Sequence, residues 1–297
     1  MIGTALTGAL LQKGYKVIIL TRDPDEYSAD EPSVQYAGWN VEEQRIDKTA
    51  IAKADHIIHL AGANVGDKRW TKKRKKEIEE SRTLSSALLI TALKETKHHV
   101  KSVIAASATG WYGEDTEESR LNRFTEDAPA TKDYLGEVCK AWESSIQPVS
   151  EMNIRLVKLR TGIVLGKSGG ALAEFKKPLK GGIAAILGSG DQHISWIQLD
   201  DLCRMYLFAI ENENVRGVYN AVSPGITTNK NLVLQLAKLL RRNFFIPVHV
   251  PGAFLKLVLG EMSIEVLKSV SVSSEKIKSA GFTFLFPGIE VALGECI

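Results

Sequence analysis

The first 23 residues, MIGTALTGALLQKGYKVIILTRD, contain the pattern that decides the fold. Gly3 opens a segment of helical character that extends to Lys13, and Gly14 marks a turn. The run KVIIL at 16–20 is continuously apolar after its lysine, which is typical of a strand buried on both faces. Glycine, helix, turn and strand therefore follow one another in that order, and Arg22 comes soon after the strand.

Strand and helix continue to alternate in the first half of the chain. Three more apolar runs predict strands at 56–60, 101–107 and 154–159, and helices are predicted at 72–94 and 134–145. This alternation predicts a mostly parallel sheet covered by helices on both faces. Ligands of such open sheets bind at the edge formed by the carboxyl ends of the strands.

From residue 163 onward the regular alternation of apolar strands and helices gives way to glycine-rich stretches and mixed elements. Glycine-rich stretches at 166–170 and 181–190 predict loops. The other expected elements are helices at 231–242, 248–260 and 264–271 and a return to the sheet near 193–196 and 218–220. We therefore expect a mixed segment that also forms a smaller lobe over the carboxyl edge of the sheet.

Composition limits the classes of function. A formal net charge of +3 over 297 residues, with 25% charged residues, is ordinary for a globular protein and calls for neither nucleic acid nor a membrane. The three cysteines, Cys139, Cys203 and Cys296, form no metal-ligand pattern and indicate reduced thiols in a cytoplasmic protein. The sequence shows no transmembrane run and no signal peptide.

Gly3 is similar to the last glycine of the G-x-G-x-x-G motif of Rossmann folds. In that motif the glycines let the backbone approach a pyrophosphate at a helix N-terminus. The first strand and the first two glycines do not precede Gly3 here, so an ordinary terminal glycine is the alternative. Because that strand is central to the sheet, we expect a longer native protein with an upstream start, or a sheet that closes up differently.

Thr21 and Arg22 lie where NAD-binding folds often place an acid for the ribose 2′-hydroxyl. An arginine at this point suits the 2′-phosphate of NADP instead. Asp23 is a competing signal, and a solvated turn arginine is the alternative interpretation. The sequence therefore predicts NADP(H) as the cofactor.

A series of motifs distributed along the whole chain resembles one protein family. They are LTRDP (20–24), HLAGAN (59–64), RWT (69–71), SR (81–82), ASATGWYG (106–113), VCKAWE (138–143), LRTGIVLG (159–166), WIQLDDL (196–202), HVP (249–251) and AGF (280–282). The chain resembles extended, atypical short-chain dehydrogenase/reductases. More narrowly, it is similar to the NAD-dependent epimerase/dehydratase-like proteins that end in a small C-terminal domain of unknown function.

This resemblance implies the fold class, and the change in sequence character after Gly162 gives the domain boundary. The fold is expected to be α/β, a Rossmann-type doubly wound parallel sheet without its first strand, with a smaller C-terminal substrate lobe. Residues 1–162 would form the NADP-binding domain. Residues 163–297 would return to the sheet and form the C-terminal lobe.

The resemblance also implies cofactor-side residues. Leu60, Ala61 and Gly62 would lie along the cofactor, where small residues let the strand end approach it. Glu77 and Arg82, on the helix that follows, resemble cofactor-side residues of the subgroup, although a solvated helix face is the alternative for Glu77.

Two functions follow from the resemblance. The first is an NADP(H)-dependent oxidoreductase or nucleotide-sugar epimerase-like protein, with a nucleotide sugar or carbonyl compound as substrate. The second is a catalytically silent NADP(H)-binding regulator, because some relatives are described as cell-division inhibitors. A homodimer is one option for its assembly.

Family enzymes use a Ser, a Tyr and a Lys, with the Tyr and Lys spaced Y-x-x-x-K on one helix face. Ser107 matches the serine and Tyr134 lies where the tyrosine is expected, but the residue four positions later is Val138. Lys140 comes six positions after Tyr134, a rotation of roughly 240° around a helix. The Y-x-x-x-K motif is therefore broken, because no lysine lies four positions after Tyr134.

Tyr112 is another candidate acid, and a packed loop aromatic is the alternative interpretation.

Three further segments have competing interpretations. Asp200 or Asp201 is expected to cap the following helix before any catalytic role. Arg160 would reach an acidic substrate group or form an ion pair. The basic run KRWTKKRKK at 68–76 is followed by acids, with Lys73–Glu77 and Lys75–Glu79 at i,i+4 spacing, so we interpret it as a solvated helix face and predict no nucleic-acid partner.

Overall fold

The computed structural model describes residues 1–27, 31–167 and 169–297. The elements up to the end of the fourth long strand are α1 (Ile2–Gln12), β1 (Val17–Thr21), η1 (Pro24–Glu26), β2 (Val34–Asn40), β3 (Arg45–Ile46), α2 (Lys48–Lys53), β4 (His56–His59), α3 (Lys72–Glu95), β5 (Ser102–Ala108), η2 (Thr109–Trp111), α4 (Glu117–Asn122), α5 (Tyr134–Ile146), η3 (Gln147–Met152) and β6 (Arg155–Thr161). The remaining elements are β7 (Ile163–Leu165), α6 (Gly170–Lys180), β8 (Ile183–Leu187), β9 (His193–Ile194), β10 (Trp196–Gln198), α7 (Leu199–Glu211), β11 (Gly217–Ala221), β12 (Thr227–Thr228), α8 (Asn229–Arg241), β13 (Ile246–Val250), α9 (Gly252–Leu259), α10 (Met262–Leu267), α11 (Glu275–Ser279) and α12 (Ile289–Glu295).

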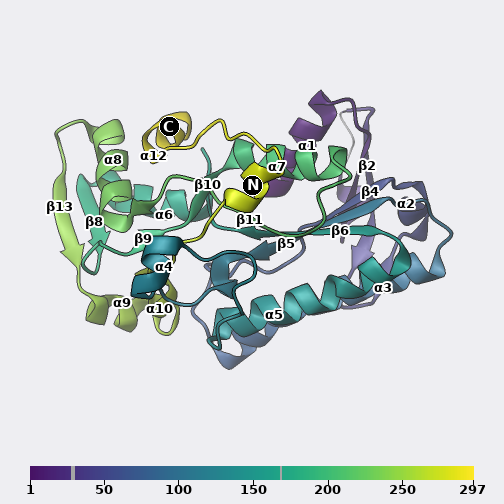
Figure 1. The fold of residues 1–297 in the computed structure, drawn as a ribbon, viewed down its shortest axis with the longest axis horizontal. Helices are drawn as coiled ribbons and strands as arrows, with labels where there is room; N and C mark the ends of the chain where they lie inside the picture. The colour runs from purple at the N-terminus through teal and green to yellow at the C-terminus, as the bar shows by residue number, and fades with distance from the viewer. Residues whose placement is uncertain (28–30, 168) are drawn as a thin grey trace.

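The main sheet contains four parallel strands in the order β11-β6-β5-β4. Helices α3 and α5 lie together on one face, and α1 and α7 lie together on the other (Figure 1). The sequence prediction of a parallel sheet between two helical layers is therefore confirmed. The strands and helices expected up to residue 159 begin and end within two residues of the observed ones.

The sheet is divided at the place where the sequence pattern lacks a strand. β1 pairs in parallel with β2, from Val17 opposite Val34 to Thr21 opposite Gly38, and β3 adds to β2 in the antiparallel sense. Over the described ranges no ladder of hydrogen bonds joins β1 to β4. The sheet therefore does not close up, and β1 and β4 each keep one unpaired edge.

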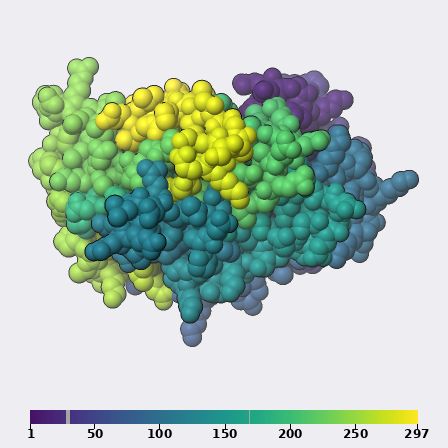
Figure 2. Space-filling view, in the orientation of Figure 1, coloured from purple at the N-terminus to yellow at the C-terminus, as the bar shows by residue number. Residues whose placement is uncertain are grey.

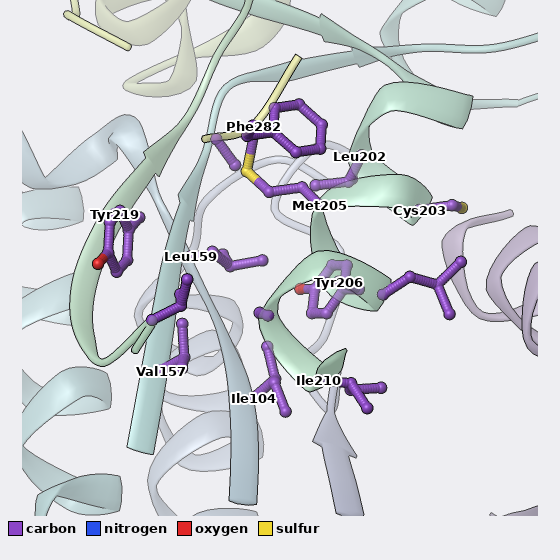
Figure 3. Close-up of a cluster of buried hydrophobic side chains, with 14 of the residues drawn as sticks. Ile104, Val157, Leu159, Leu202, Cys203, Met205, Tyr206, Ile210, Tyr219 and Phe282 are labelled. Atoms are coloured by element: carbon purple, nitrogen blue, oxygen red, sulfur yellow. The ribbon is translucent and has the colours of Figure 1, made fainter. Parts of the chain in front are cut away.

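The largest core lies between the main sheet and the α1–α7 layer. Ile104 of β5, Leu159 of β6 and Tyr219 of β11 contribute from the strands, and Met205 and Tyr206 contribute from α7 (Figure 3). Burial of each such side chain contributes about 1.5–3 kcal/mol of transfer free energy. This packing holds the carboxyl ends of the strands, where the candidate site lies, in a fixed arrangement.

The second half differs from the expected elements in three places. The predicted helix 248–260 is wrong at its start, because residues up to Val250 form β13 beside β8 and the helix begins at Gly252. The predicted helix 264–271 ends at Leu267, and the next residues bond to the 115–124 segment. The expected return to the main sheet is confirmed at β11, whereas β9 and β10 belong to separate two-stranded ladders. Among the described helices, none is long and apolar enough to span a bilayer.

Candidate functional site

The N-terminus of α1 lies against the end of β4. A Cβ atom added at Gly3 would lie 4.0 Å from Leu60 Cδ1. The N-cap residue Met1 forms no side-chain hydrogen bond to the first turn, so the amides of Ile2, Gly3 and Thr4 have no side-chain cap. Free amides and the helix dipole make such an end suitable for a phosphate group.

The end of β1 lies at the edge that the split leaves unpaired. Thr21 is the last residue of the strand, and Arg22 follows it with an exposed side chain. The exposed Arg22 side chain is accessible to an anionic group.

Arg82 of α3 bonds to the loop after β4 and also packs against α5. Its side chain is buried, and Nη1 donates to the Ala63 carbonyl at 3.1 Å and to the Ile78 carbonyl at 2.7 Å. The guanidinium lies 4.7 Å from the centre of the Trp142 ring, and a Cβ added at Gly62 would lie 3.1 Å from Arg82 Cζ. Only a residue without a side chain therefore fits easily between the Arg82 side chain and the loop.

Glu77 lies one turn before this contact on α3 and is half exposed. Its carboxylate pairs with Arg74 at 2.7 Å, and this hydrogen bond lowers the pKa of Glu77. Arg74 also donates to the carbonyl of Asn64. In this structure Glu77 thus acts through Arg74 on the loop that follows Gly62. The basic run that precedes Glu77 forms Lys76–Glu80 and Lys75–Glu261 pairs among the described residues, and not the expected Lys73–Glu77 and Lys75–Glu79 pairs.

Ser107, at the end of β5, belongs to a buried charged network. Its hydroxyl donates to Glu143 Oε1 at 2.7 Å. Arg160 of β6 binds the same carboxylate in a bidentate manner, with Nε 2.7 Å from Oε1 and Nη2 3.2 Å from Oε2. Lys158 lies 3.6 Å from Oε2. Because its proton points to Glu143, the serine is left to accept, not donate, a further hydrogen bond.

Tyr112 extends this network to the carboxyl end of β11. Its hydroxyl donates to Asn220 Oδ1 at 2.6 Å and accepts a hydrogen bond from Arg160 Nη1 at 3.0 Å. The residue is fully buried, and burial raises the pKa of Tyr112 to about 12. These contacts match the packed-aromatic interpretation of Tyr112.

Tyr134 and Lys140 are not brought to Ser107. The Tyr134 hydroxyl donates to the Lys75 carbonyl at 3.0 Å, and burial raises the pKa of Tyr134 to about 12. Ser107 contacts Glu143, which lies nine positions after Tyr134 and therefore about 13.5 Å further along the helix. Lys140 is exposed to solvent, between the buried residues Gly136 and Glu143 along α5.

Comparison with known proteins places this geometry in a family. The model of the NAD dependent epimerase/dehydratase family matches residues 1–221, and a domain of unknown function, DUF1731, matches residues 250–296. The chain belongs to this epimerase/dehydratase family. It is 33% identical to the epimerase family protein SSP1921 of Staphylococcus saprophyticus, over 100% of this chain and 96% of that protein. It is 30% identical to the epimerase family protein SDR39U1 of Mus musculus, over 100% and 96% respectively.

Solved structures agree with the fold of the family. The human epimerase family protein SDR39U1, crystallised with NADPH, superposes with a TM-score of 0.85 at 27% identity, over 100% of this chain and 95% of that one. A nucleoside-diphosphate sugar epimerase from Corynebacterium glutamicum gives a TM-score of 0.74 at 27% identity, over 99% of this chain and 55% of that one.

Within this epimerase/dehydratase fold, Glu143 was not among the residues predicted from sequence. A weak signal was present, because Gly136, Cys139 and Glu143 have the spacing of one buried face of α5. For Arg160 the ion-pair alternative describes what the structure contains. The expected aspartate cap of α7 is wrong: the Gln198 side chain accepts from the amides of Asp200 and Asp201, because Asp201 is held by the amides of residues 285 and 286.

Proposed function

We propose that this protein binds NADP(H) at the edge formed by α1, β1 and the end of β4. The observation that carries the proposal is the exposed Arg22 side chain directly after β1, a strand whose second edge is unpaired over the described ranges. Gly3 at the uncapped start of α1 lies against Leu60 in the same structure. The NADPH in the human relative's crystal structure supports the same cofactor.

The predicted cofactor-side residues other than Glu77, which pairs with Arg74, each have a physical role in this proposal. The free amides of the first turn of α1, around Gly3, would hold the pyrophosphate. Arg22, next to Thr21, would pair with the 2′-phosphate, which NADH lacks. Leu60, Ala61 and Gly62 would flank the nucleotide, with Arg82 fixing their loop. When bound, the nicotinamide supplies or accepts a hydride.

Calorimetric titration with NADPH and NADH tests this assignment. Arg22→Ala should weaken NADPH binding about tenfold or more and leave NADH binding unchanged, because a charged hydrogen bond contributes about 1.5–3 kcal/mol. Arg45→Ala is the matched control, since Arg45 is an exposed arginine in the same β1–β2–β3 ladder. Equal losses for both nucleotides, or none, would remove the 2′-phosphate role of Arg22.

For chemistry, the geometry supports a catalytically silent NADP(H)-binding protein of regulatory type. Tyr134 lies apart from Ser107, and Lys140 is exposed. Among the described residues, these three side chains therefore do not form a shared Ser–Tyr–Lys catalytic site. In this proposal NADPH remains unoxidised in the presence of nucleotide sugars and carbonyl compounds. Steady turnover of any compound in such a panel would reject it.

An oxidoreductase or nucleotide-sugar epimerase activity is the second candidate. It is favoured by the position of Ser107 at the carboxyl end of β5, next to a buried carboxylate. If turnover is found, Ser107→Ala should lower kcat strongly, whereas Tyr134→Phe should change it little because its hydroxyl is bonded to Lys75. The reverse result would restore Tyr134 as the acid.

A further inference from the structure

The small sheet of the C-terminal lobe is covered on one face only. β8 and β13 pair in parallel, with Ile183 opposite Ile246 and Ala185 opposite Val248. The alternate residues of β8, Ala184 and Ile186, are buried in a cluster with side chains of α6 and α8. Side chains alternate between faces along a strand, so Ile183, Ile246 and Val248 project from the opposite face, where Ile246 is 68% exposed.

Exposed apolar side chains also occur in the residues just before and just after β13. Phe244, in the turn before the strand, is 84% exposed. In α9, which follows the strand, Phe254, Leu257 and Val258 are exposed at i, i+3 and i+4 spacing, and therefore share one helical face. Figure 1 shows α8, β13 and α9 together at one end of the molecule, away from α1 and β2. Large exposed apolar surfaces of this kind mark interaction sites.

The sequence around this apolar surface is net positive. Residues 174–191 and 238–265, which contain β8, β13 and α9, hold seven lysines and arginines: Lys176, Lys177, Lys180, Lys238, Arg241, Arg242 and Lys256. They also hold four acids, Glu174, Asp191, Glu261 and Glu265, of which Glu174 pairs with Lys177 and Glu261 pairs with Lys75. The resulting net charge of +3 on these segments equals the formal charge of the whole chain, so positive charge is concentrated at this end. The complementary partner is therefore anionic.

We propose that the β8–β13 face and α9 dock on an anionic membrane surface, by insertion of Phe244, Ile246 and the exposed face of α9 between lipids. Apolar side chains flanked by lysine and arginine suit the interface of a bilayer with anionic headgroups. A second copy of the chain would bring like charges together across a two-fold axis. Figure 2 shows this end of the molecule in light green at the left, with its atoms at the surface. This association is peripheral and independent of the proposed cofactor site.

Vesicle co-sedimentation tests the proposal. The protein should sediment with vesicles that mix phosphatidylcholine and phosphatidylglycerol, and remain in solution with phosphatidylcholine alone. Salt should weaken the binding, because screening acts on the electrostatic part. No sedimentation with the anionic vesicles, or equal sedimentation with both, would overturn the proposal. A dimer in analytical ultracentrifugation that Ile246→Asp dissociates, in a protein that binds no vesicles, would assign the face to a second copy instead.

Variants separate the electrostatic contribution to vesicle binding from the contribution of apolar insertion. Arg242→Gln combined with Lys256→Gln should weaken vesicle binding about 25-fold, since each cation near the surface contributes about 1 kcal/mol. Phe254→Ser combined with Leu257→Ser should weaken it at least tenfold at constant charge. The matched controls, Lys140→Gln and Leu121→Ser, change an exposed cation and an exposed apolar residue elsewhere and should have no effect. Equal losses in the controls would show that the binding is unspecific and overturn the assignment.

Discussion

The main sheet and the β8–β13 sheet differ in how many of their faces are covered. The main sheet lies between the α3–α5 and α1–α7 layers, and even its charged residues, such as Arg160, are buried and paired. The β8–β13 sheet is packed against α6 and α8 on one face and exposes Ile246 on the other. A doubly covered sheet must satisfy its polar groups internally, whereas a singly covered one leaves an apolar surface for a ligand.

The largest effect is expected next to the main sheet, at Glu143 of α5. Glu143→Gln leaves the buried Arg160 without its counter-ion, which should reduce the free energy of unfolding by about 3–5 kcal/mol. Urea denaturation measures the change. Glu137→Gln, an exposed glutamate of the same helix, is the control and should change stability by less than about 0.5 kcal/mol.

The double variant Glu143→Leu/Arg160→Met tests the origin of that loss. Replacing both charges by apolar side chains removes the unpaired guanidinium, so part of the stability should return. Lys158 keeps its hydrogen bond to Gln147 but still lacks Glu143, so the recovery should be incomplete. If Glu143→Gln costs less than about 1 kcal/mol, the network is not the enclosed, paired arrangement described here.

A somewhat smaller effect should come from His59, on the edge strand β4 of the main sheet. Burial lowers the pKa of His59 to about 4, and its Nε2 lies 3.3 Å from the hydroxyls of Ser85 and Ser86. In the unfolded chain a histidine has a pKa of about 6.5, so the unfolded state gains a proton first as the pH falls.

Stability from neutral His59 is therefore fully present above about pH 6.5 and is lost as the pH falls towards about 4, by on the order of 3 kcal/mol. Urea denaturation at several pH values, compared between the native chain and His59→Asn, isolates this slope. The exposed His249 on β13 provides the control, since His249→Asn should leave the slope intact. An unchanged slope in His59→Asn would mean that His59 titrates normally in the folded protein.

The smallest effect on stability should be found on the exposed face of the β8–β13 sheet. Ile246→Val should change the free energy of unfolding by less than about 0.5 kcal/mol, because the side chain is already in solvent. Ile186→Val, on the covered face of the same sheet, should cost about 1 kcal/mol. Equal costs at both positions would show that the two faces are packed alike. Thermal or urea denaturation distinguishes these outcomes.

Local pattern predicted most of the first half of the fold. The apolar runs before His59 and Ser107 could be assigned as strands because a strand buried on both faces needs an unbroken apolar run. The helix of residues 248–250 was assigned wrongly because an apolar stretch of that length suits either element, and only pairing with β8 decides. The site was predicted in part. Arg22 and Gly3 were selected by motif, but Glu143 has a partner 36 positions away in Ser107, which no local pattern reveals.

The sequence by itself determined the alternation of strand and helix, the family, and the absence of a Y-x-x-x-K pair, since each depends on residues close together in the chain. Only the tertiary structure decided that Ser107 donates to Glu143, that Asp201 binds the amides of residues 285 and 286, and that the sheet stays divided between β1 and β4. Hydrogen bonds and burial depend on distances between atoms that the chain brings together only when it folds. Periodicity specifies which face of an element is apolar, and packing specifies what covers that face.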